Sequence, residues 1–336
     1  MPEHLSAIKA GASVKNKTML ILSAHESELL SAANNLGVAQ ARRKPIHIRK
    51  PHFRIRPKGA AAHPAPARSE RSVRDFFAAH TRYELLGVVG HGGMGQVYKA
   101  RDRMLNLTVA LKFLPPHLAE NPEALESFKN EARIVMQLSH QNIVKLHNLE
   151  SGPAGLFIIM EYVDGRDFHA ILKEMGRLSL ASTTQILRSC AKALDYAHGR
   201  SVLHKDLKPA NLMLDHESSL KIVDFGIAGQ ISGVSDDDGY MEGTIPYISP
   251  EQIQGLPLDP RCDVYALGAV IYECLAGRPV FPANTPPESL LELEPDPIPG
   301  LPDGVMQALY TALAKDREAR WMSAGDFHLA VSAAQG

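Results

Sequence analysis

The sequence predicts an α+β protein in two lobes, and three observations support this prediction. Strand-like segments dominate residues 83–163, and a glycine-rich turn separates the first two of them. Helix-like segments dominate residues 180–334. Separate runs of strands and helices are typical of α+β architecture, and a chain of 336 residues is long enough for two lobes with their own cores.

The elements follow one another in a simple order. Residues 83–89 and 96–100 alternate like two strands, and further strands are expected at 107–114 and 156–163. Residues 122–138 have the apolar spacing of a helix. Asp164-Gly165 is typical of a connector between the lobes. The remaining predicted helices cover residues 180–199, 260–276, 303–315 and 323–334.

Charge divides the chain into a basic arm and an acidic body. Residues 1–78 hold 14 Lys and Arg against 5 Asp and Glu, which leaves 22 against 32 for the rest. Residues 42–58 carry eight basic side chains and no acidic one, and an Ala/Pro-rich stretch follows. We expect residues 1–78 to be a mostly disordered extension, with a short helix at 18–34. The folded domain is expected at 79–333, with lobes at 79–161 and 165–333.

Several classes of protein are not expected from this composition. The three cysteines lack metal-ligand spacing and are expected to be buried thiols in a reducing compartment. No apolar run is long enough to span a bilayer, so we expect a cytoplasmic protein. Phe53 is the single aromatic residue in the basic stretch, so a nucleic-acid partner is not expected. The arm could instead be autoinhibitory, resemble a substrate, or bind another anionic partner.

A glycine-rich stretch, GHGGMGQV, is the first candidate binding element. Gly90, Gly92 and Gly95 lack a Cβ, so the backbone could approach a polyphosphate and offer N–H donors. The spacing also occurs in dinucleotide-binding folds, but those require a helix directly after the last glycine. Here a strand-like segment, QVYKA, follows. The pattern therefore favours a β-hairpin that covers phosphates.

Lys112 is the next candidate, because it lies in the apolar strand VALK. Burying an unpaired lysine is costly, although an edge lysine could also extend to solvent. Glu131 follows 19 residues later on the predicted helix. An ion pair between the two would direct the ammonium of Lys112 towards α- and β-phosphates.

The stretch HKDLKPAN and the later DFG carry the polar groups that phosphoryl transfer requires. Asp206 could orient a hydroxyl nucleophile and accept its proton. Lys208 would neutralise the moving phosphoryl group. Asn211 and Asp224 offer the oxygen ligands that magnesium prefers. Positioning and electrostatics of this kind supply most of the rate of phosphoryl transfer.

The ordered set GxGxxGxV, VALK, HKDLKPAN, DFG and SPE resembles the protein kinase family over about residues 81–331. LKPAN, with Lys208, resembles the serine/threonine branch. The Met within HGGMGQVYKA and the GTxxYxSPEQ ending resemble bacterial, eukaryotic-like serine/threonine kinases. The resemblance implies a bilobal protein-kinase fold. It also implies a serine/threonine protein kinase that acts in signal transduction. Such an enzyme would use Mg²⁺ or Mn²⁺ to transfer the γ-phosphate of ATP to Ser/Thr hydroxyls, and it would also phosphorylate itself. Its partners would be protein substrates, and self-association of kinase domains is a further expectation.

The resemblance also assigns site residues. The catalytic set is Asp206, Lys208, Lys112 and Glu131, and the metal ligands are Asn211 and Asp224. The ATP-binding set is Gly90, His91, Gly92, Gly93, Met94, Gly95, Val97, Ala110, Lys112, Glu161 and Val163. Within it, Val97 and Ala110 would be adenine-pocket walls, and Glu161 to Val163 would form the hinge after Met160.

Other residues would support these sites rather than react. By the same resemblance, Gly243-Thr244 and Tyr247 to Glu251 would form the platform for the substrate peptide. Glu251 would pair with Arg320, and Asp263 would support the catalytic loop. His204 and Phe225 would be packing residues.

Lys205 departs from the family pattern, because many members have Arg at this position. Arg binds phosphate through two parallel hydrogen bonds, whereas Lys keeps only the charge. We consider two hypotheses for the acidic stretch Asp236 to Asp238. Its fixed charges could replace loop phosphate and face Lys205, or it could be a solvated, mobile tip.

Two other functions are compatible with parts of the pattern. A pseudokinase scaffold would keep the fold without catalysis, but Lys112, Glu131, Asp206, Asn211 and Asp224 are all present. A small-molecule phosphotransferase would not need the predicted peptide platform or Lys208. The residues therefore favour an active protein kinase.

Overall fold

The computed structural model describes residues 70–335 apart from 93–94, 115–120, 153–154 and 226–244. Its larger sheet is antiparallel and has the strand order β1-β2-β3-β5-β4. The strands are β1 (Tyr83–Gly92), β2 (Gly95–Asp102), β3 (Leu107–Phe113), β4 (Leu146–Gly152) and β5 (Gly155–Glu161). The sequence predicted four of these strands and missed β4, which mixes polar and apolar residues.

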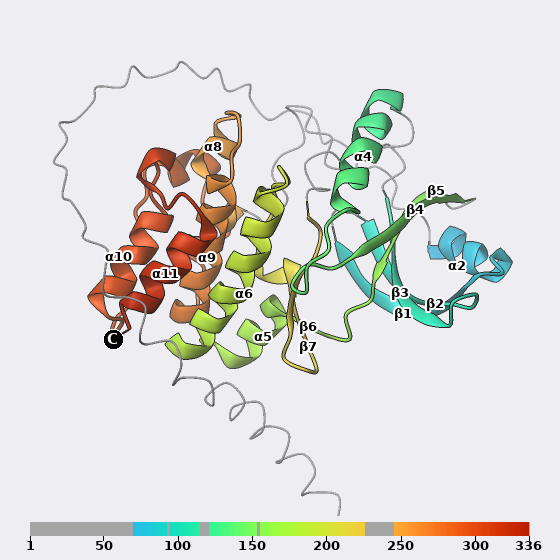
Figure 1. The fold of residues 1–336 in the computed structure, drawn as a ribbon, viewed down its shortest axis with the longest axis horizontal. Helices are drawn as coiled ribbons and strands as arrows, with labels where there is room; N and C mark the ends of the chain where they lie inside the picture. The colour runs from blue at the N-terminus through green and yellow to red at the C-terminus, as the bar shows by residue number, and fades with distance from the viewer. Residues whose placement is uncertain (1–69, 93–94, 115–120, 153–154, 226–244, 336) are drawn as a thin grey trace, which may run out of the picture. The chain divides into compact units, whose positions relative to one another are not determined.

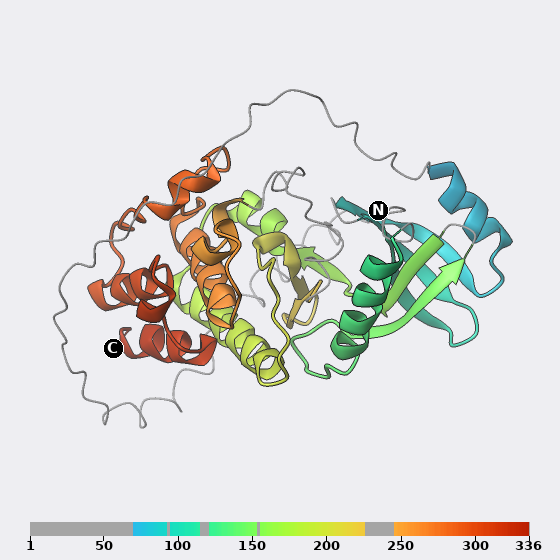
Figure 2. The same cartoon turned by 90° about the horizontal axis from the view of Figure 1, so that it is seen from above.

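Strand β3 is buried on both faces of the sheet, and its side chains alternate between two cores. Ala110 and Leu114 join a core with helix α4 (Pro122–Val135), whereas Val109, Leu111 and Phe113 join a second core with helix α2 (Glu70–Ala79). Figures 1 and 2 show these helices on different sides of the sheet. The α4 core continues into the helical half of the molecule.

Helix α2 changes the predicted boundary of the N-terminal extension. We expected residues 70–78 to belong to the mostly disordered arm, but the side chains of Val73, Phe76 and Phe77 are buried against the sheet. The Phe76 ring lies 5.3 Å from that of Phe113 and 5.2 Å from that of Phe157, both in edge-to-face geometry. This aromatic packing outweighs the polar composition of the segment. The predicted helix at 18–34 lies outside the described residues.

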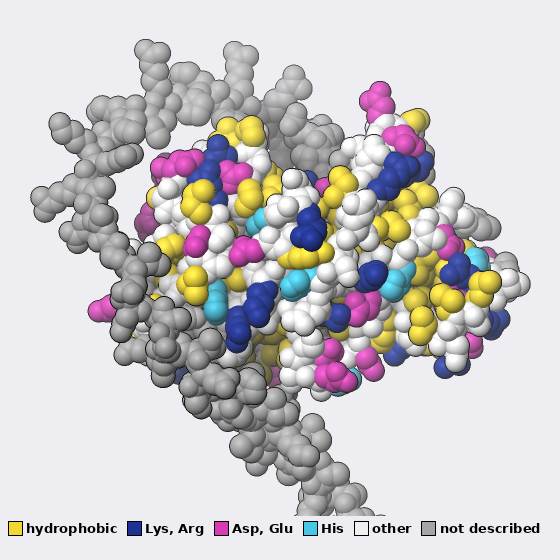
Figure 3. Space-filling view, in the orientation of Figure 1, with side chains coloured by type: hydrophobic (Ala, Val, Ile, Leu, Met, Phe, Trp, Pro, Cys, Tyr) yellow, Lys and Arg dark blue, Asp and Glu magenta, His cyan; other side chains and the backbone are white. Residues whose placement is uncertain are grey.

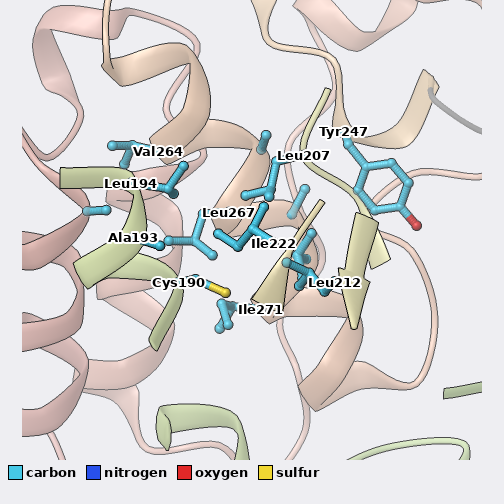
Figure 4. Packing of buried hydrophobic residues seen from close by; sticks show 14 of the residues in the cluster. Cys190, Ala193, Leu194, Leu207, Leu212, Ile222, Tyr247, Val264, Leu267 and Ile271 are labelled. Carbon is cyan, nitrogen blue, oxygen red and sulfur yellow. The ribbon is translucent and has the colours of Figure 1, made fainter. Parts of the chain in front are cut away.

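The second half is mainly helical, as the sequence predicted. Its helices are α5 (Phe168–Met175), α6 (Leu180–His198), α8 (Pro250–Ile253), α9 (Arg261–Ala276), α10 (Asp303–Ala312) and α11 (Ala324–Ala333). Helix α9 is buried almost all round and packs against α6, α10 and α11. In Figure 4, Cys190 and Leu194 of α6 point towards Leu267 and Ile271 of α9. This core supports the segment that carries Asp206.

A small antiparallel sheet completes the fold beside these helices. It has the order β6-β7-β8, with β6 (Gly165–Asp167), β7 (Leu212–Asp215) and β8 (Leu220–Ile222). Leu212 pairs with Ile222, which brings Asn211 and Asp224 to the same end of the β7–β8 hairpin. The backbone N–H of Val223 donates to the carbonyl of Asn211 at 2.9 Å.

The described surface has a mixed polar character. Basic and acidic side chains are interspersed on the face shown in Figure 3. Among the described residues, no helix combines the length and the apolar character needed to cross a membrane.

Candidate active site

The loop between α6 and β7 is fixed by a buried carboxylate from the central helix. Asp263 of α9 accepts hydrogen bonds from the backbone N–H groups of His204 and Lys205, both at 2.8 Å, and lies 2.7 Å from His198 Nε2. Burial opposes ionisation of Asp263, but the His198 contact and these N–H donors outweigh it and lower its pKa. The prediction that Asp263 supports this loop is confirmed. His198 was not singled out from the sequence.

The loop brings three predicted site residues together. Lys208 Nζ lies 2.9 Å from Asp206 Oδ2, and Asn211 Nδ2 lies 3.2 Å from the same oxygen. Asn211 Nδ2 also donates to the backbone carbonyl of Asp206 at 2.7 Å. Asp206 and Asn211 are buried, so their positions are well defined. The arrangement can hold a carboxylate, an ammonium and an amide oxygen around one substrate.

Asp224 joins this group from the end of β8. Its Oδ1 lies 2.8 Å from Lys112 Nζ, which comes from β3 of the large sheet. Burial tends to raise the pKa of Asp224, but the charge and hydrogen bond of Lys112 outweigh it and lower the pKa. Asp224 has φ 62° and Lys205 has φ 68°, a left-handed backbone that is uncommon for residues other than glycine. Unusual backbone of this kind concentrates at functional sites.

The predicted ion pair between Lys112 and Glu131 is wrong for this structure. Lys112 pairs with Asp224, and Glu131 Oε1 lies 3.1 Å from Lys205 Nζ instead. Spacing along the chain placed Glu131 on the correct helix, α4. It could not decide which of two nearby lysines the carboxylate contacts. The hypothesis that Lys205 faces Asp236 to Asp238 concerns a segment outside the described residues.

The glycine-rich stretch forms the predicted β-hairpin rather than the start of a helix. Strands β1 and β2 pair Gly90 with Val97, His91 with Gln96 and Gly92 with Gly95. A Cβ added at Gly90 would meet no atom within 4 Å, so the backbone is open on this side. Gly93 and Met94 lie outside the described residues.

The predicted adenine-pocket residues lie on neighbouring strands. Ala110 of β3 pairs with Met160 of β5, and both side chains are buried. Val97 of β2 and Val163 beyond β5 are partly buried against the same core. The structure therefore brings Ala110 and Met160 together on paired strands, whereas Val97 and Val163 share with them only the same large core.

Glu161 ends β5, and both its backbone and its side chain have polar partners. Its backbone N–H donates to the carbonyl of Lys145 at 2.9 Å, and its side chain lies 2.7 Å from Lys221 Nζ on β8. This ion pair ties the segment between the two halves to the small sheet. Sequence reasoning missed Lys221, because an isolated lysine in a short strand carries no signal of its partner.

The donor set fits a divalent cation. The amide nitrogen of Asn211 is used by Asp206, so the amide oxygen is the atom suited to a hard cation, beside the carboxylate of Asp224. Within the described part of the chain, no group of three or more His, Cys, Asp or Glu residues forms a complete metal site. A cation here would therefore need further oxygen ligands from a bound substrate or water.

The structure describes the predicted substrate platform only from Ile245 onwards. Gly243 and Thr244 lie outside the described residues. Tyr247 donates a hydrogen bond to Glu273 of α9 at 2.5 Å. Glu251 forms two hydrogen bonds with Arg320, at 2.6 and 2.7 Å, and both residues are buried. The predicted Glu251–Arg320 pair is confirmed, whereas Glu273 was not singled out from the sequence.

His204 and Phe225 have the predicted packing role. Their rings lie 4.8 Å apart, and both side chains are buried. His204 Nε2 also lies 2.9 Å from the carbonyl of Val223. This contact connects the loop that carries Asp206 to the segment that carries Asp224.

Comparisons with known proteins agree with the geometry. Residues 83–295 match the family described as the protein kinase domain. The chain is 36% identical over 266 residues to the probable serine/threonine-protein kinase PknB of Bifidobacterium longum, and 36% identical over 262 residues to the serine/threonine-protein kinase PknA of Mycobacterium tuberculosis. These alignments cover 73% and 75% of this chain but 38% and 61% of the relatives.

A solved structure has a similar fold. The crystal structure of the Mycobacterium tuberculosis PknI kinase domain matches with a TM-score of 0.62 and 30% identity. The match covers 75% of this chain and 96% of that one.

Proposed function

The chain belongs to the protein kinase family, and on this premise we propose that it transfers the γ-phosphoryl group of ATP to Ser or Thr hydroxyls of proteins. One observation supports this most strongly. Lys112 of β3, Asp224 after β8 and one short loop come from three separate segments, and the loop carries Asp206, Lys208 and Asn211. The contacts Lys112–Asp224, Lys208–Asp206 and Asn211–Asp206 connect these residues into two clusters.

Each side chain has a distinct role in this proposal. Asp206 orients the acceptor hydroxyl and takes its proton, and Lys208 beside it stabilises negative charge on the moving phosphoryl group. Lys112 binds phosphate oxygens. The hairpin of β1 and β2 covers the phosphates with backbone N–H groups.

Asn211 and Asp224 are the proposed ligands for Mg²⁺ or Mn²⁺. A cation bound there would neutralise charge on the phosphates and orient them for in-line transfer. Asp224 contacts Lys112 through Oδ1 at 2.8 Å, so its second oxygen, Oδ2, is the proposed ligand. Adenine would rest between Val97, Ala110 and Val163, with backbone groups of Glu161 to Val163 as hydrogen-bond partners.

The test is a radiolabelled-ATP assay with a mixed protein substrate, followed by identification of the labelled residues. We expect the wild type to label Ser or Thr residues and Asp206→Asn to lose activity by about 10² to 10⁴-fold. Asp303→Asn is the matched control, because Asp303 is an exposed carboxylate at the start of α10.

Label on tyrosine alone, or equal activity of Asp206→Asn and wild type, would contradict the proposal. Self-phosphorylation is measured in the same assay without added substrate. A wild type that binds ATP but transfers no phosphate would indicate a scaffold rather than an enzyme.

A further inference from the structure

Gln252 connects the predicted substrate platform to the loop that carries Asp206. It lies on α8, directly after Glu251, and its amide nitrogen Nε2 donates to the backbone carbonyl of Lys205 at 2.7 Å. Its amide oxygen Oε1 accepts from the backbone N–H of Ser249 at 3.1 Å and from the hydroxyl of Ser249 at 3.0 Å. One side chain is therefore hydrogen-bonded to both segments.

These partners determine the orientation of the amide. The backbone N–H of Ser249 can only donate, so the amide oxygen must face it. The carbonyl of Lys205 can only accept, so the amide nitrogen must face it. If the oxygen and nitrogen were exchanged, two donors would meet at one end and two acceptors at the other. Gln252 thus fits between the two segments in one orientation.

The carbonyl that Gln252 contacts belongs to the peptide unit between Lys205 and Asp206. This unit is planar, so the position of its oxygen also fixes the direction of the N–H of Asp206. That N–H donates to Nδ1 of His204 at 3.3 Å, and the N–H of Lys205 donates to Asp263 at 2.8 Å. Lys205 has φ 68°, a conformation that is unfavourable for a residue with a Cβ. Hydrogen bonds on both sides of Lys205 therefore hold the backbone that leads into Asp206.

We propose that Gln252 is a positioning residue for phosphoryl transfer, which sets the place of the acceptor peptide relative to Asp206. The platform holds the peptide, and Asp206 takes the proton of its hydroxyl. Gln252 is hydrogen-bonded to Ser249 of the platform and to the residue before Asp206, so it keeps the distance between them constant. The rate of transfer depends steeply on such alignment. This inference rests on the proposed function, because it concerns the same reaction.

The choice of glutamine rather than glutamate at position 252 supports this role. Ser249 and Gln252 form a capping box at the start of α8, and capping boxes accept Glu as well as Gln at this position. The cap uses only the amide oxygen. Glutamate would supply that oxygen but no donor for the carbonyl of Lys205. The helix cap therefore explains one half of the amide, and the contact with Lys205 explains the other.

The test is steady-state kinetics of Gln252→Glu in the full chain, with ATP, Mg²⁺ and a mixed protein substrate. Glutamate keeps the size of the side chain and the acceptor for Ser249, but it places a carboxylate against the carbonyl of Lys205. We expect kcat to fall by about 10- to 100-fold, whereas KM for ATP stays unchanged. Calorimetry with a non-hydrolysable ATP analogue counts the competent sites, and kcat is expressed per site so that unfolded protein does not contribute.

Gln254→Glu is the matched control. It makes the same chemical change two residues later, at the exposed end of α8. Its kcat per site should equal that of the wild type. Gln252→Met is the second variant, because it removes the donor without adding a charge. Its kcat per site should lie between those of the wild type and Gln252→Glu.

Wild-type kcat per site in either Gln252 variant would overturn the inference. So would a loss of ATP affinity or of binding sites in Gln252→Glu, because that pattern indicates a merely structural role. A Met variant less active than the Glu variant would assign the effect to the helix cap and not to the contact with Lys205. A wild type that binds the analogue but transfers no phosphate to protein would overturn the proposed function itself, whatever the variants do.

Discussion

Arg320 and Glu251 show how much depends on a single buried contact. Both charged groups are removed from water, and the guanidinium also donates to the carbonyls of Ala314 and Arg261. Removing one partner of such a pair leaves the other charged, buried and unpaired. The pair connects α8, which includes the last residues of the predicted substrate platform, to the segment before α11.

We therefore expect Glu251→Gln to lower the free energy of unfolding by about 3–5 kcal/mol, measured by urea denaturation. The matched control is Glu126→Gln, which removes an exposed partner of Lys129 on α4 and should not change stability measurably. Equal stability of the two variants would show that burial does not decide the contribution of this pair.

Lys315 gives a second prediction, which concerns pH. Its amine has no hydrogen-bond partner in the described part of the chain and lies 4.6 Å from the centre of the Phe281 ring. Burial lowers the pKa of Lys315 from 10.5 to about 8. Between these pH values the unfolded chain binds a proton that the native protein does not, so native stability rises with pH there.

We expect Lys315→Met to be more stable than the wild type at pH 7, because the buried charge is removed. The difference in the free energy of unfolding between the two proteins should shrink as pH rises from about 8 to 10.5. In this range the native amine is already neutral, and taking its proton away costs less free energy as pH rises. The measurement is the free energy of unfolding of both proteins at pH 7, 9 and 10.5. A difference that stays constant over this range would contradict the prediction.

For individual residues, the sequence predicted several side chains that the fold brings into contact, but not all of the contact partners. Asp206, Lys208 and Asn211 lie within six positions, so local geometry brings them together. The partners of Lys112 and Glu131 come from segments far apart in the chain, and several opposite charges compete for each. That choice depends on the position of α4 relative to the catalytic loop, which no local pattern contains.

Helix α2 is the element that sequence reasoning assigned to the arm. Its three buried apolar side chains cover one face of the sheet, next to Tyr98, Phe113 and Phe157. Without the helix these aromatic rings would be exposed to water.

Deletion of residues 1–69 should therefore leave the free energy of unfolding nearly unchanged. Deletion of residues 1–79 should lower this free energy by several kcal/mol. For a domain of this size, that corresponds to on the order of 10 °C in Tm. Phe76→Ala in the full chain tests the same packing without truncation and should cost about 3–5 kcal/mol. Two truncations with the same Tm would contradict a structural role for α2.

The elements that the sequence predicted well are long enough to carry a clear pattern: β3 is a seven-residue, mostly apolar run, and α6 has helical apolar spacing over 19 residues. The missed strands β7 and β8 have four and three residues, too short for a period to be visible. They are defined by pairing with each other and by the bridge between Ile143 and Ile222. Long-range pairing of this kind is decided by the assembled fold.

For the whole molecule, the proposed ATP site uses side chains from both the large sheet and the helical half. A ligand that contacts both should stabilise them together. At a concentration 100 times its Kd, an ATP analogue with Mg²⁺ should add about 2.7 kcal/mol to the free energy of unfolding. This would raise Tm by roughly 5–10 °C.

A chelator should remove most of this shift, and Asp224→Ala should remove its dependence on Mg²⁺, because Asp224 is a proposed ligand. Asp303→Asn should keep the full shift, since its carboxylate lies on the exposed surface of α10. The measurement is thermal unfolding with and without Mg²⁺. A shift that is the same in Asp224→Ala and wild type would exclude Asp224 as a ligand.

The left-handed backbone of Lys205 and Asp224 has a consequence for attempts to engineer this protein. A glycine at position 205 would relieve about 1 kcal/mol of backbone strain, whereas at position 224 the loss of the buried Lys112 ion pair would outweigh that relief. Screening a random library for heat resistance alone should therefore enrich Gly at position 205 but keep Asp at position 224. Directed evolution could thus reach a sturdier protein without altering the carboxylate proposed to bind the cation.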